Sequence, residues 1–369
     1  MRGETERFAV GFKTLMERKN PATGMNYSDG SFCQESGPGM GIEHSFELLS
    51  LEQIERTAAA IAPYIQQTPV HRWHGRELDS LMTPETRVLL KLELFQSSGT
   101  FKARGVIANL LSLSDEERRC GVTAMSAGNH AIAVAWGAAQ FGISAKVVMQ
   151  ANANPARVAA ARSWGAEVVS AVDGPTGFAM AEEIAAIEGR RFIHPFDGVQ
   201  TTLGTASLGL EFARQALGLD AVIIAIGGGG LAGGAGRALK LLQPRCEVIG
   251  VEPEGADSMH RSFAAGTAQR IDRVDTIADS LAPPMALPYG YAMCRASVDR
   301  LVKVSDAEIR AAMGLLFREM KLAVEPAGAA AVAALVYRLR EELRGRRVGV
   351  VVCGSNIDAA GFAAHLARL

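Results

Sequence analysis

The segment AVIIAIGGGGLAGGAGRALKLL, residues 221–242, decides the fold that we predict. It opens with a short apolar run, which is typical of a parallel strand buried on both faces. Four glycines follow, Gly227 to Gly230, and a helical pattern begins at Leu231. A strand, a glycine turn and a helix in this order predict one repeating unit of an α/β fold.

The same alternation continues on both sides of this segment. We expect further strands at 88–94, 121–126, 145–150, 166–171, 191–196, 247–252 and 347–354. We expect further helices at 101–113, 131–142, 155–165, 177–189, 205–217 and 323–343. An amphipathic helix capped by Ser50 is expected ahead of them all. The pattern predicts parallel twisted sheets flanked by helices, and 369 residues suit two packed lobes.

Composition restricts the class of protein. The formal net charge is -1 and no lysine- or arginine-rich run occurs, so we expect neither a nucleic-acid partner nor a membrane partner. The N-terminus lacks the apolar core of a signal peptide. Five cysteines without a CxxC pair favour reduced thiols, and hence a cytoplasmic protein. The turn-rich residues 1–45 predict a poorly ordered extension.

Lys102 lies in SSGTFKARG (97–105), where a strand and a polar turn lead into a helix. Burial at such a junction lowers the pKa of a lysine, and the neutral amine is both a nucleophile and a base. An exposed lysine at a helix start would give the same sequence pattern.

Three other turns could bind polar groups. SAGNHA (126–131) opens a helix, whose free N–H groups are suited to a carboxylate. Gly227 to Gly230 allow the backbone to approach a phosphate closely. CGSN (353–356) follows an apolar strand, at the end where α/β proteins bind ligands. A helix cap, close helix packing and a buried core thiol would also explain these turns.

The glycine turn also permits a different class of ligand. Gly228, Gly230 and Gly233 satisfy G-x-G-x-x-G, and Glu252 follows about 20 residues later at the end of the next predicted strand. This spacing is that of a dinucleotide site, in which the acid binds a ribose hydroxyl. An NAD-dependent oxidoreductase is therefore the alternative from another class.

In series, these motifs resemble those of the threonine dehydratase and serine racemase family, the fold type II (tryptophan synthase β-like) pyridoxal phosphate enzymes. SSGTFKARG, SAGNHA, GGGGLAGG and CGSN occur in the family's order, and TIADSLA (276–282) and VEPAGA (324–329) are also similar to family segments. The resemblance runs from about residue 46 to the C-terminus. It favours pyridoxal phosphate over a dinucleotide.

The resemblance implies a role for each motif. Lys102 would carry pyridoxal 5′-phosphate as a Schiff base and then act as the base at Cα. Phe101 would pack on the cofactor ring, Asn129 would bind its hydroxyl, and Cys353 would face its pyridine nitrogen. The residues implied to hold the phosphate are Gly227, Gly228, Gly229, Gly230 and Leu231. Those implied to receive the substrate are Ser126, Ala127, Gly128, Asn129 and His130.

The resemblance also implies a domain organisation. Residues 46–115 and 198–369 would form a large cofactor-binding domain, and 116–197 a small domain that closes over a small amino-acid substrate. A homodimer is expected. The regulatory domain of biosynthetic threonine dehydratases does not follow CGSN, so isoleucine feedback is not expected.

The implied reaction removes water and ammonia from an L-threonine- or L-serine-type 3-hydroxy amino acid, giving a 2-oxo acid. A thiol does not protonate the ring nitrogen, which favours prompt elimination over transamination. Thr202, Leu203 and Ile132 depart from the family pattern, so a bulkier or acidic substrate, of phenylserine or hydroxyaspartate type, is also open. Ala127 replaces the serine that serves racemases as a second base, so we predict little racemisation.

A divalent-metal segment of the family is only partly matched. Glu252 and Ala256 agree with it, but Ser258 stands where a carboxylate ligand is expected. We therefore predict no metal.

Overall fold

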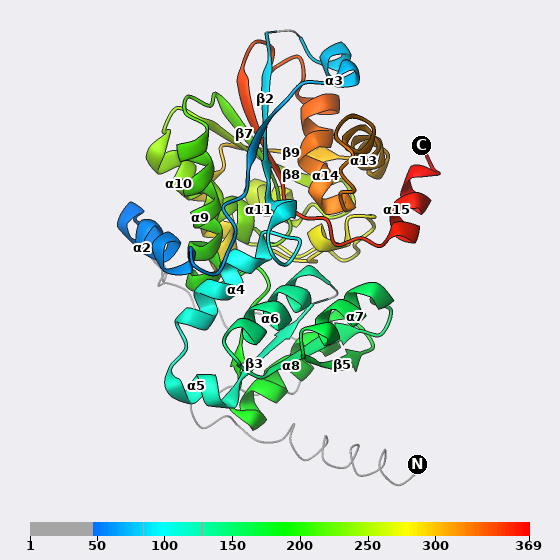
Figure 1. Ribbon diagram of the computed structural model, residues 1–369. Helices are drawn as coiled ribbons and strands as arrows, with labels where there is room; N and C mark the ends of the chain where they lie inside the picture. Colours follow the sequence, from blue (N-terminus) through cyan, green and yellow to red (C-terminus); the bar gives the residue numbers. More distant parts are fainter. Residues whose placement is uncertain (1–46, 84, 127) are drawn as a thin grey trace, which may run out of the picture. The chain divides into compact units, whose positions relative to one another are not determined.

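The computed structural model describes residues 47–83, 85–126 and 128–369. The predicted extension, 1–45, and Ala127 lie outside the described residues. Two sheets form the framework (Figure 1). The larger sheet has the order β1-β2-β10-β7-β8-β9, and the smaller sheet has the order β5-β4-β3-β6.

The larger sheet is built from strands that lie far apart in the sequence. Its members are β1 (Val70–Trp73), β2 (Arg87–Leu92), β7 (Ala221–Ala225), β8 (Glu247–Pro253), β9 (Arg300–Val304) and β10 (Arg347–Val352). The pairs from β2 to β9 are parallel, and Val350 of β10 lies between Leu90 and Ile223. The edge strand β1 pairs antiparallel with β2, which the prediction of parallel sheets did not include.

Helices cover both faces of the larger sheet. Val222 and Ile224 pack toward α9 (Val199–Gln215) and α10 (Gly230–Leu242), whereas Ile223 and Ala225 belong to the cluster formed with α13 (Asp306–Met320) and α14 (Pro326–Ala333). Successive side chains of a strand point to opposite faces, so an unbroken apolar run is the expected sequence of a strand covered twice. The fold is α/β, as predicted.

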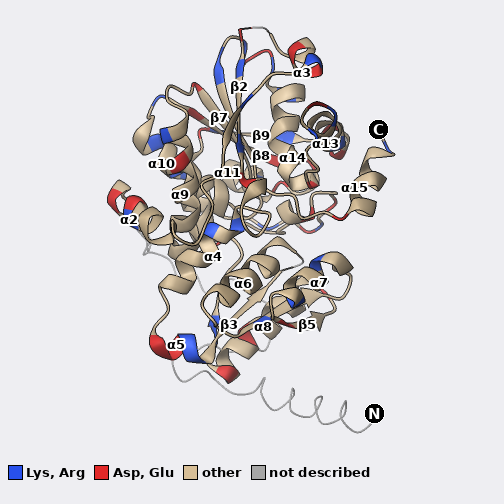
Figure 2. Ribbon diagram, in the orientation of Figure 1, with Lys and Arg blue, Asp and Glu red and all other residues tan. Residues whose placement is uncertain are grey.

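The smaller sheet contains β3 (Val122–Met125), β4 (Ala145–Gln150), β5 (Glu167–Ala171) and β6 (Arg191–Phe192), all parallel. Apolar contacts cover one face with α6 (Asn129–Gln140) and α7 (Pro155–Ser163), and the other with α8 (Gly174–Glu188). Helix α6 contains no charged residue and is drawn in one colour (Figure 2). It is buried along most of its length because α4 (Lys102–Leu111) packs on its other side.

Six further helices complete the described part of the fold. They are α2 (Leu51–Ile61), α3 (Arg76–Leu81), α5 (Asp115–Cys120), α11 (Ser258–Ala265), α12 (Pro288–Ser297) and α15 (Ala359–Leu366). Ser50 caps α2 through a capping box, as its position predicted. All strands of the smaller sheet lie within residues 116–197, and all strands of the larger sheet lie outside that range. The division into two domains at these residues stays a prediction.

Two predicted elements differ from the structure in their bounds. The strand expected at 191–196 stops at Phe192, because the N–H groups of Phe196 and Asp197 turn back to donate to Nδ1 of His194. The helix expected at 323–343 starts at Pro326, and after Ala333 it changes to a π-helical turn, Ala334–Arg338.

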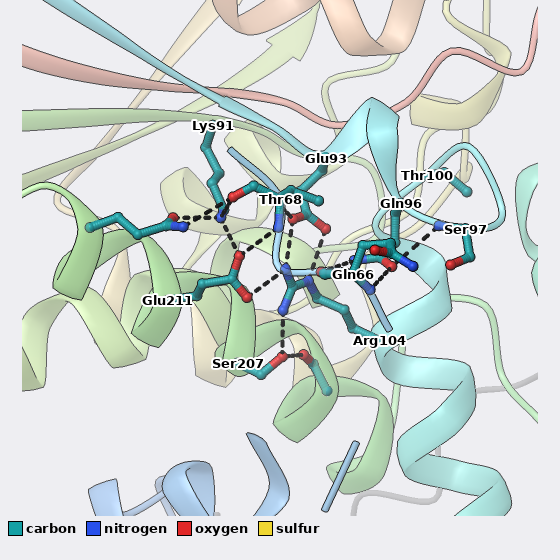
Figure 3. A network of polar contacts seen from close by, with 12 residues as sticks. Gln66, Thr68, Lys91, Glu93, Gln96, Ser97, Thr100, Arg104, Ser207 and Glu211 are labelled. Atoms are coloured by element: carbon teal, nitrogen blue, oxygen red, sulfur yellow. Dashed lines mark hydrogen bonds and ion pairs between the residues drawn. The ribbon is translucent and has the colours of Figure 1, made fainter. Parts of the chain in front are cut away.

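The strand expected at 88–94 ends at Leu92, where the chain tightens into a 3₁₀ turn, Glu93–Phe95. This turn directs Glu93 into a buried cluster of four charges (Figure 3). Arg104 makes two hydrogen bonds to the Glu93 carboxylate, at 2.8 and 2.9 Å, and one of 3.0 Å to Glu211. Glu211 in turn pairs with Lys91. The cluster links β2, the 3₁₀ turn, α4 and α9.

We predict that Glu93→Gln lowers the free energy of unfolding by about 3 kcal/mol, because Arg104 is 1% exposed and would keep only part of its counter-charge. Urea unfolding followed by circular dichroism measures the change. The control is Glu55→Gln, which breaks an ion pair with Arg214 whose side chains are 58% and 43% exposed. A loss below about 1 kcal/mol is expected there, and equal losses in both variants would contradict the prediction.

Candidate functional site

Lys102 is the first residue of α4 and is only partly exposed. Its position is set by contacts to the end of β10: the Phe101 N–H donates to the Cys353 carbonyl at 3.1 Å, and Thr100 bridges to Gly354. The Lys102 amine donates to the carbonyl of Pro195 and lies 5.0 Å from the centre of the Phe101 ring.

The surroundings of Lys102 favour a neutral amine. Burial lowers the pKa of Lys102 to about 8, and the acidic groups of Cys353 and Glu325 act in the opposite direction. A lower pKa leaves a larger share of the amine unprotonated near neutral pH. The expectation that Lys102 is a buried, reactive lysine is therefore consistent with its environment.

One cavity brings several of the predicted residues together. Its lining includes Phe101, Lys102, His130, Gly230 and Leu231, all singled out from the sequence. The others that line it are Gly105, Val106, Pro195, Phe196, Thr201 and Thr205. The lysine motif, the start of α6 and the glycine turn thus meet in space, although they are far apart in the chain.

The glycine turn connects β7 to α10 and cannot accept side chains. A Cβ on Gly228 would lie 2.0 Å from the Phe196 ring, and one on Gly230 would lie 2.3 Å from the Phe196 carbonyl oxygen. Gly229 has φ +97°, a conformation that favours glycine, and caps α10 without a side-chain hydrogen bond. No side chain therefore caps the first N–H groups of α10, and the positive end of the helix dipole lies at this turn.

The turn before α6 has a similar character. Gly128 precedes the helix and supplies no side-chain cap, while the Ser126 hydroxyl accepts a hydrogen bond of 3.1 Å from the Gly128 N–H. His130 is buried, and its Nε2 lies 2.8 Å from the Ile193 carbonyl. Burial lowers the pKa of His130 to about 3, so the ring is neutral. Nothing is described for Ala127.

Asn129 and Cys353 are not among the residues that line this cavity. The Asn129 amide nitrogen donates to Ser280 at 3.1 Å and to Glu325 at 2.6 Å. Cys353 is 3% exposed, its Sγ lies 3.6 Å from the Ala327 carbonyl, and burial raises the pKa of its thiol. Burial therefore keeps the thiol protonated, and that Cys353 faces the pyridine nitrogen stays a prediction.

Sequence reasoning missed two charged residues at this site. Glu325 is 1% exposed beside Asn129, and Arg157 of α7 forms ion pairs with Glu325 and Asp279. Glu325 lies in VEPAGA (324–329), a segment similar to one of the family, and it is a single acid in an apolar run, but no role was predicted for it from the sequence. Nothing local in the sequence marks Arg157, because its partners are more than 100 residues away.

The structure also bears on the dinucleotide alternative. Glu252 ends β8 as the spacing predicted, but its carboxylate accepts hydrogen bonds from the N–H groups of Met259 and His260, each at 2.8 Å. It caps α11 and is 0% exposed. Both oxygens of this carboxylate already accept hydrogen bonds from the backbone, so Glu252 is not free to bind a ribose hydroxyl. The NAD-dependent alternative is therefore not favoured. Within the described ranges, no group of three or more His, Cys, Asp or Glu residues could hold a metal ion.

The residues present fit pyridoxal phosphate. Lys102 supplies a partly buried amine suited to its aldehyde, and the start of α10, which no side chain caps, supplies N–H groups suited to its phosphate. The Cys353 thiol, which burial keeps protonated, is a ring partner that carries no charge. Phe196 leaves no space for a side chain at Gly228 or Gly230 of the glycine turn.

Comparison with known proteins identifies the class. A family model described as "Pyridoxal-phosphate dependent enzyme" matches residues 61–354, and the chain belongs to that family. The resemblance found in the motifs and the predicted cofactor are thereby confirmed.

Individual members of the family are similar to this chain over most of its length. The chain is 55% identical to the phenylserine dehydratase of Ralstonia pickettii over 319 residues, 86% of this chain and 97% of that protein. It is 39% identical to the catabolic L-threonine dehydratase of Escherichia coli K12, over 73% of this chain and 83% of that protein. The structure of maize serine racemase superposes with a TM-score of 0.80 at 30% identity, covering 87% of this chain and 98% of that chain.

We predict that Gly230→Ala weakens pyridoxal phosphate binding at least about tenfold, because the new Cβ would meet backbone at Phe196 that cannot turn aside. Titration of the apoprotein with the cofactor, followed by visible absorption, measures the dissociation constant. The control is Gly361→Ala in α15, where the nearest atom is a flexible Asp358 oxygen at 3.1 Å. Unchanged affinity in Gly230→Ala would show that the turn does not hold the phosphate.

Proposed function

We propose that this enzyme removes water and ammonia from a 3-hydroxy amino acid and releases a 2-oxo acid. The observation that carries the proposal is the meeting of Lys102, the start of α10 and His130 of α6 around one cavity. The names of the relatives support the same reaction class, since they include dehydratases of phenylserine and L-threonine.

Pyridoxal phosphate, when bound, supplies an electron-withdrawing ring that makes the Cα proton of an attached amino acid removable. In the proposal, Lys102 binds the cofactor aldehyde and later takes the Cα proton. Its lowered pKa of about 8 supports both tasks, because a neutral amine is available near neutral pH. The Cα proton and the hydroxyl leave together as water, which gives an enamine, and the enamine takes up water to give the 2-oxo acid and ammonia.

The start of α6 is the proposed site of the substrate carboxylate. Gly128 provides no side chain there, and the helix directs its first N–H groups and its positive end toward this turn. We assign carboxylate binding to Ser126, Gly128, Asn129 and His130, with Ala127 included on sequence grounds. Because Ala127 carries no group that could act as a second base, we propose that racemisation is minor.

The cavity supports a substrate with an apolar side chain. Beside Lys102 it is lined by Phe101, Val106, Phe196 and Leu231, and no acidic or basic residue other than Lys102 and His130 is among the described lining residues. Substrates of the L-threonine and L-serine type fit this lining. The similarity to a phenylserine dehydratase also supports 3-phenylserine as a substrate.

We further propose a cytoplasmic homodimer with a large domain, 46–115 and 198–369, and a small domain, 116–197. Cys120, Cys246, Cys294 and Cys353 are all free, which supports a reducing compartment. No helix in the described part of the chain has the length and apolar character needed to cross a membrane.

We predict that Lys102→Ala abolishes the visible absorption of the bound cofactor and lowers turnover about 10²–10⁴-fold, because both the attachment point and the base are lost. Absorption spectra and an assay for 2-oxo acid give the two readings. Lys146→Ala, which removes a lysine paired with Glu188, should change neither. A Lys102→Ala protein with wild-type turnover would refute the assignment.

We predict that L-threonine, L-serine and 3-phenylserine each release ammonia and a 2-oxo acid in equal amounts. 3-Hydroxyaspartate should react poorly, because the lining offers no cation apart from Lys102. A coupled ammonia assay on this panel ranks the substrates, and chiral chromatography of the remaining serine reports racemisation. Release of ammonia from none of them would reject the proposed reaction.

A further inference from the structure

Glu325 is a buried acid to which the proposed reaction gives no role. It precedes α14, is 1% exposed, and uses its two oxygens differently. Oε1 accepts a hydrogen bond of 2.6 Å from the Asn129 amide, and Oε2 accepts one of 3.2 Å from Arg157. A carboxylate so deeply buried is costly to keep charged unless a cation and hydrogen-bond donors face it.

Arg157 reaches Glu325 from the other half of the fold. It lies on α7, beside the smaller sheet, whereas Glu325, Asp279 and Asn356 belong to segments around the larger sheet. Its guanidinium pairs with Glu325 and Asp279, and its Nε donates to the Asn356 carbonyl at 2.9 Å. The same side chain crosses Gly128, where a Cβ would lie 2.8 Å from it.

The Asn129 amide is held in one orientation by this arrangement. Its nitrogen donates to Glu325 and Ser280, and its oxygen accepts a hydrogen bond of 2.8 Å from Asn356. An ionised carboxylate can only accept, so it must face the NH₂ side of the amide. A protonated Glu325 could also donate to the amide oxygen, and the amide would then no longer be held in one orientation.

Charges around Glu325 decide its protonation. Burial raises the pKa of Glu325 to about 7, while Arg157 and Lys102 act to lower it and Asp279 acts to raise it further. The Cys353 thiol also faces Glu325. Arg157 makes the largest opposing contribution, and it is the group supplied by the other half of the fold.

We propose that Glu325 is a positioning residue whose carboxylate fixes the Asn129 amide, and that Arg157 keeps this carboxylate ionised while α7 rests against the segments around the larger sheet. Contact between the two halves is thereby coupled to the orientation of a residue at the cofactor. The inference rests on the proposed function, because that function places Asn129 against the cofactor.

The test is a pH titration of the holoenzyme's visible absorption without substrate. The variants are Glu325→Gln, Arg157→Gln and the double variant, with Arg157→Lys as the conservative replacement. Glu325→Gln is expected to lower the pH midpoint by about one unit, because a nearby anion favours the protonated nitrogen at Lys102. Arg157→Gln should shift the midpoint in the wild-type background and leave it unchanged when Glu325 is already glutamine. Arg157→Lys should retain the wild-type midpoint.

Arg318→Gln is the matched control, since it removes an exposed arginine paired with Glu77 and should not move the midpoint. A Glu325→Gln titration that superimposes on the wild type would overturn the inference, as would a shift from Arg157→Gln of equal size in both backgrounds. If Glu325→Gln does not fold, equal midpoints for Arg157→Gln and Arg157→Lys would overturn it. A colourless wild-type protein would refute the proposed function as well, whereas a coloured protein without these shifts refutes only the role of Glu325.

Discussion

The buried pairing of Arg104 with Glu93 and Glu211 is the constraint from which the site follows. Removing a charge from water costs several kcal/mol, so each member of the cluster is tolerated only while its partners stay in place. Lys91 comes from β2, Glu93 from the 3₁₀ turn that follows it, Arg104 from α4, and Glu211 from α9. Any sliding of α4 along the sheet would separate these charges.

This constraint fixes Lys102 because Lys102 and Arg104 share the first turn of α4. One end of that turn is held by the ion pairs and the other by the backbone contacts of Thr100 and Phe101 to the end of β10. These contacts hold the backbone of Lys102 in place, although its side chain is long and flexible. Enzymes commonly orient catalytic groups by such rigid surroundings. Glycines with no space for a Cβ then set how closely the start of α10 approaches the same cavity.

Local sequence patterns predicted much of this arrangement, and long-range contacts account for the rest. The strand at 145–150 and the strand–glycine–helix unit at 221–242 were predictable because apolar runs and glycine turns act locally. The edge strand β1 was missed, since its sequence VHRW alternates too briefly to stand out. Helix α13 is not among the predicted helices, although the capping box formed by Ser305 and Glu308 is a local signal for its start.

For the site, motif order placed Lys102, the glycine turn and the start of α6, but it could not show Glu325 and Arg157 as partners. Their meeting depends on how two sheets pack, which a sequence pattern does not encode. The apolar Pro195 and Phe196 predict that the strand from residue 191 continues to 196, whereas the N–H groups of Phe196 and Asp197 turn back to donate to His194.

The cap that Glu252 provides for α11 bears on how this scaffold can change its cofactor. The glycine turn alone would permit a dinucleotide, and a designer or natural selection could seek one by adding ribose contacts at the end of β8. Turning Glu252 toward a ribose would leave the N–H groups of Met259 and His260 without an acceptor, in a place where Glu252 and Met259 are fully buried. A new cap for α11 would have to appear first, so the commitment to one cofactor is maintained by hydrogen bonds at a helix start to which the proposed reaction gives no role.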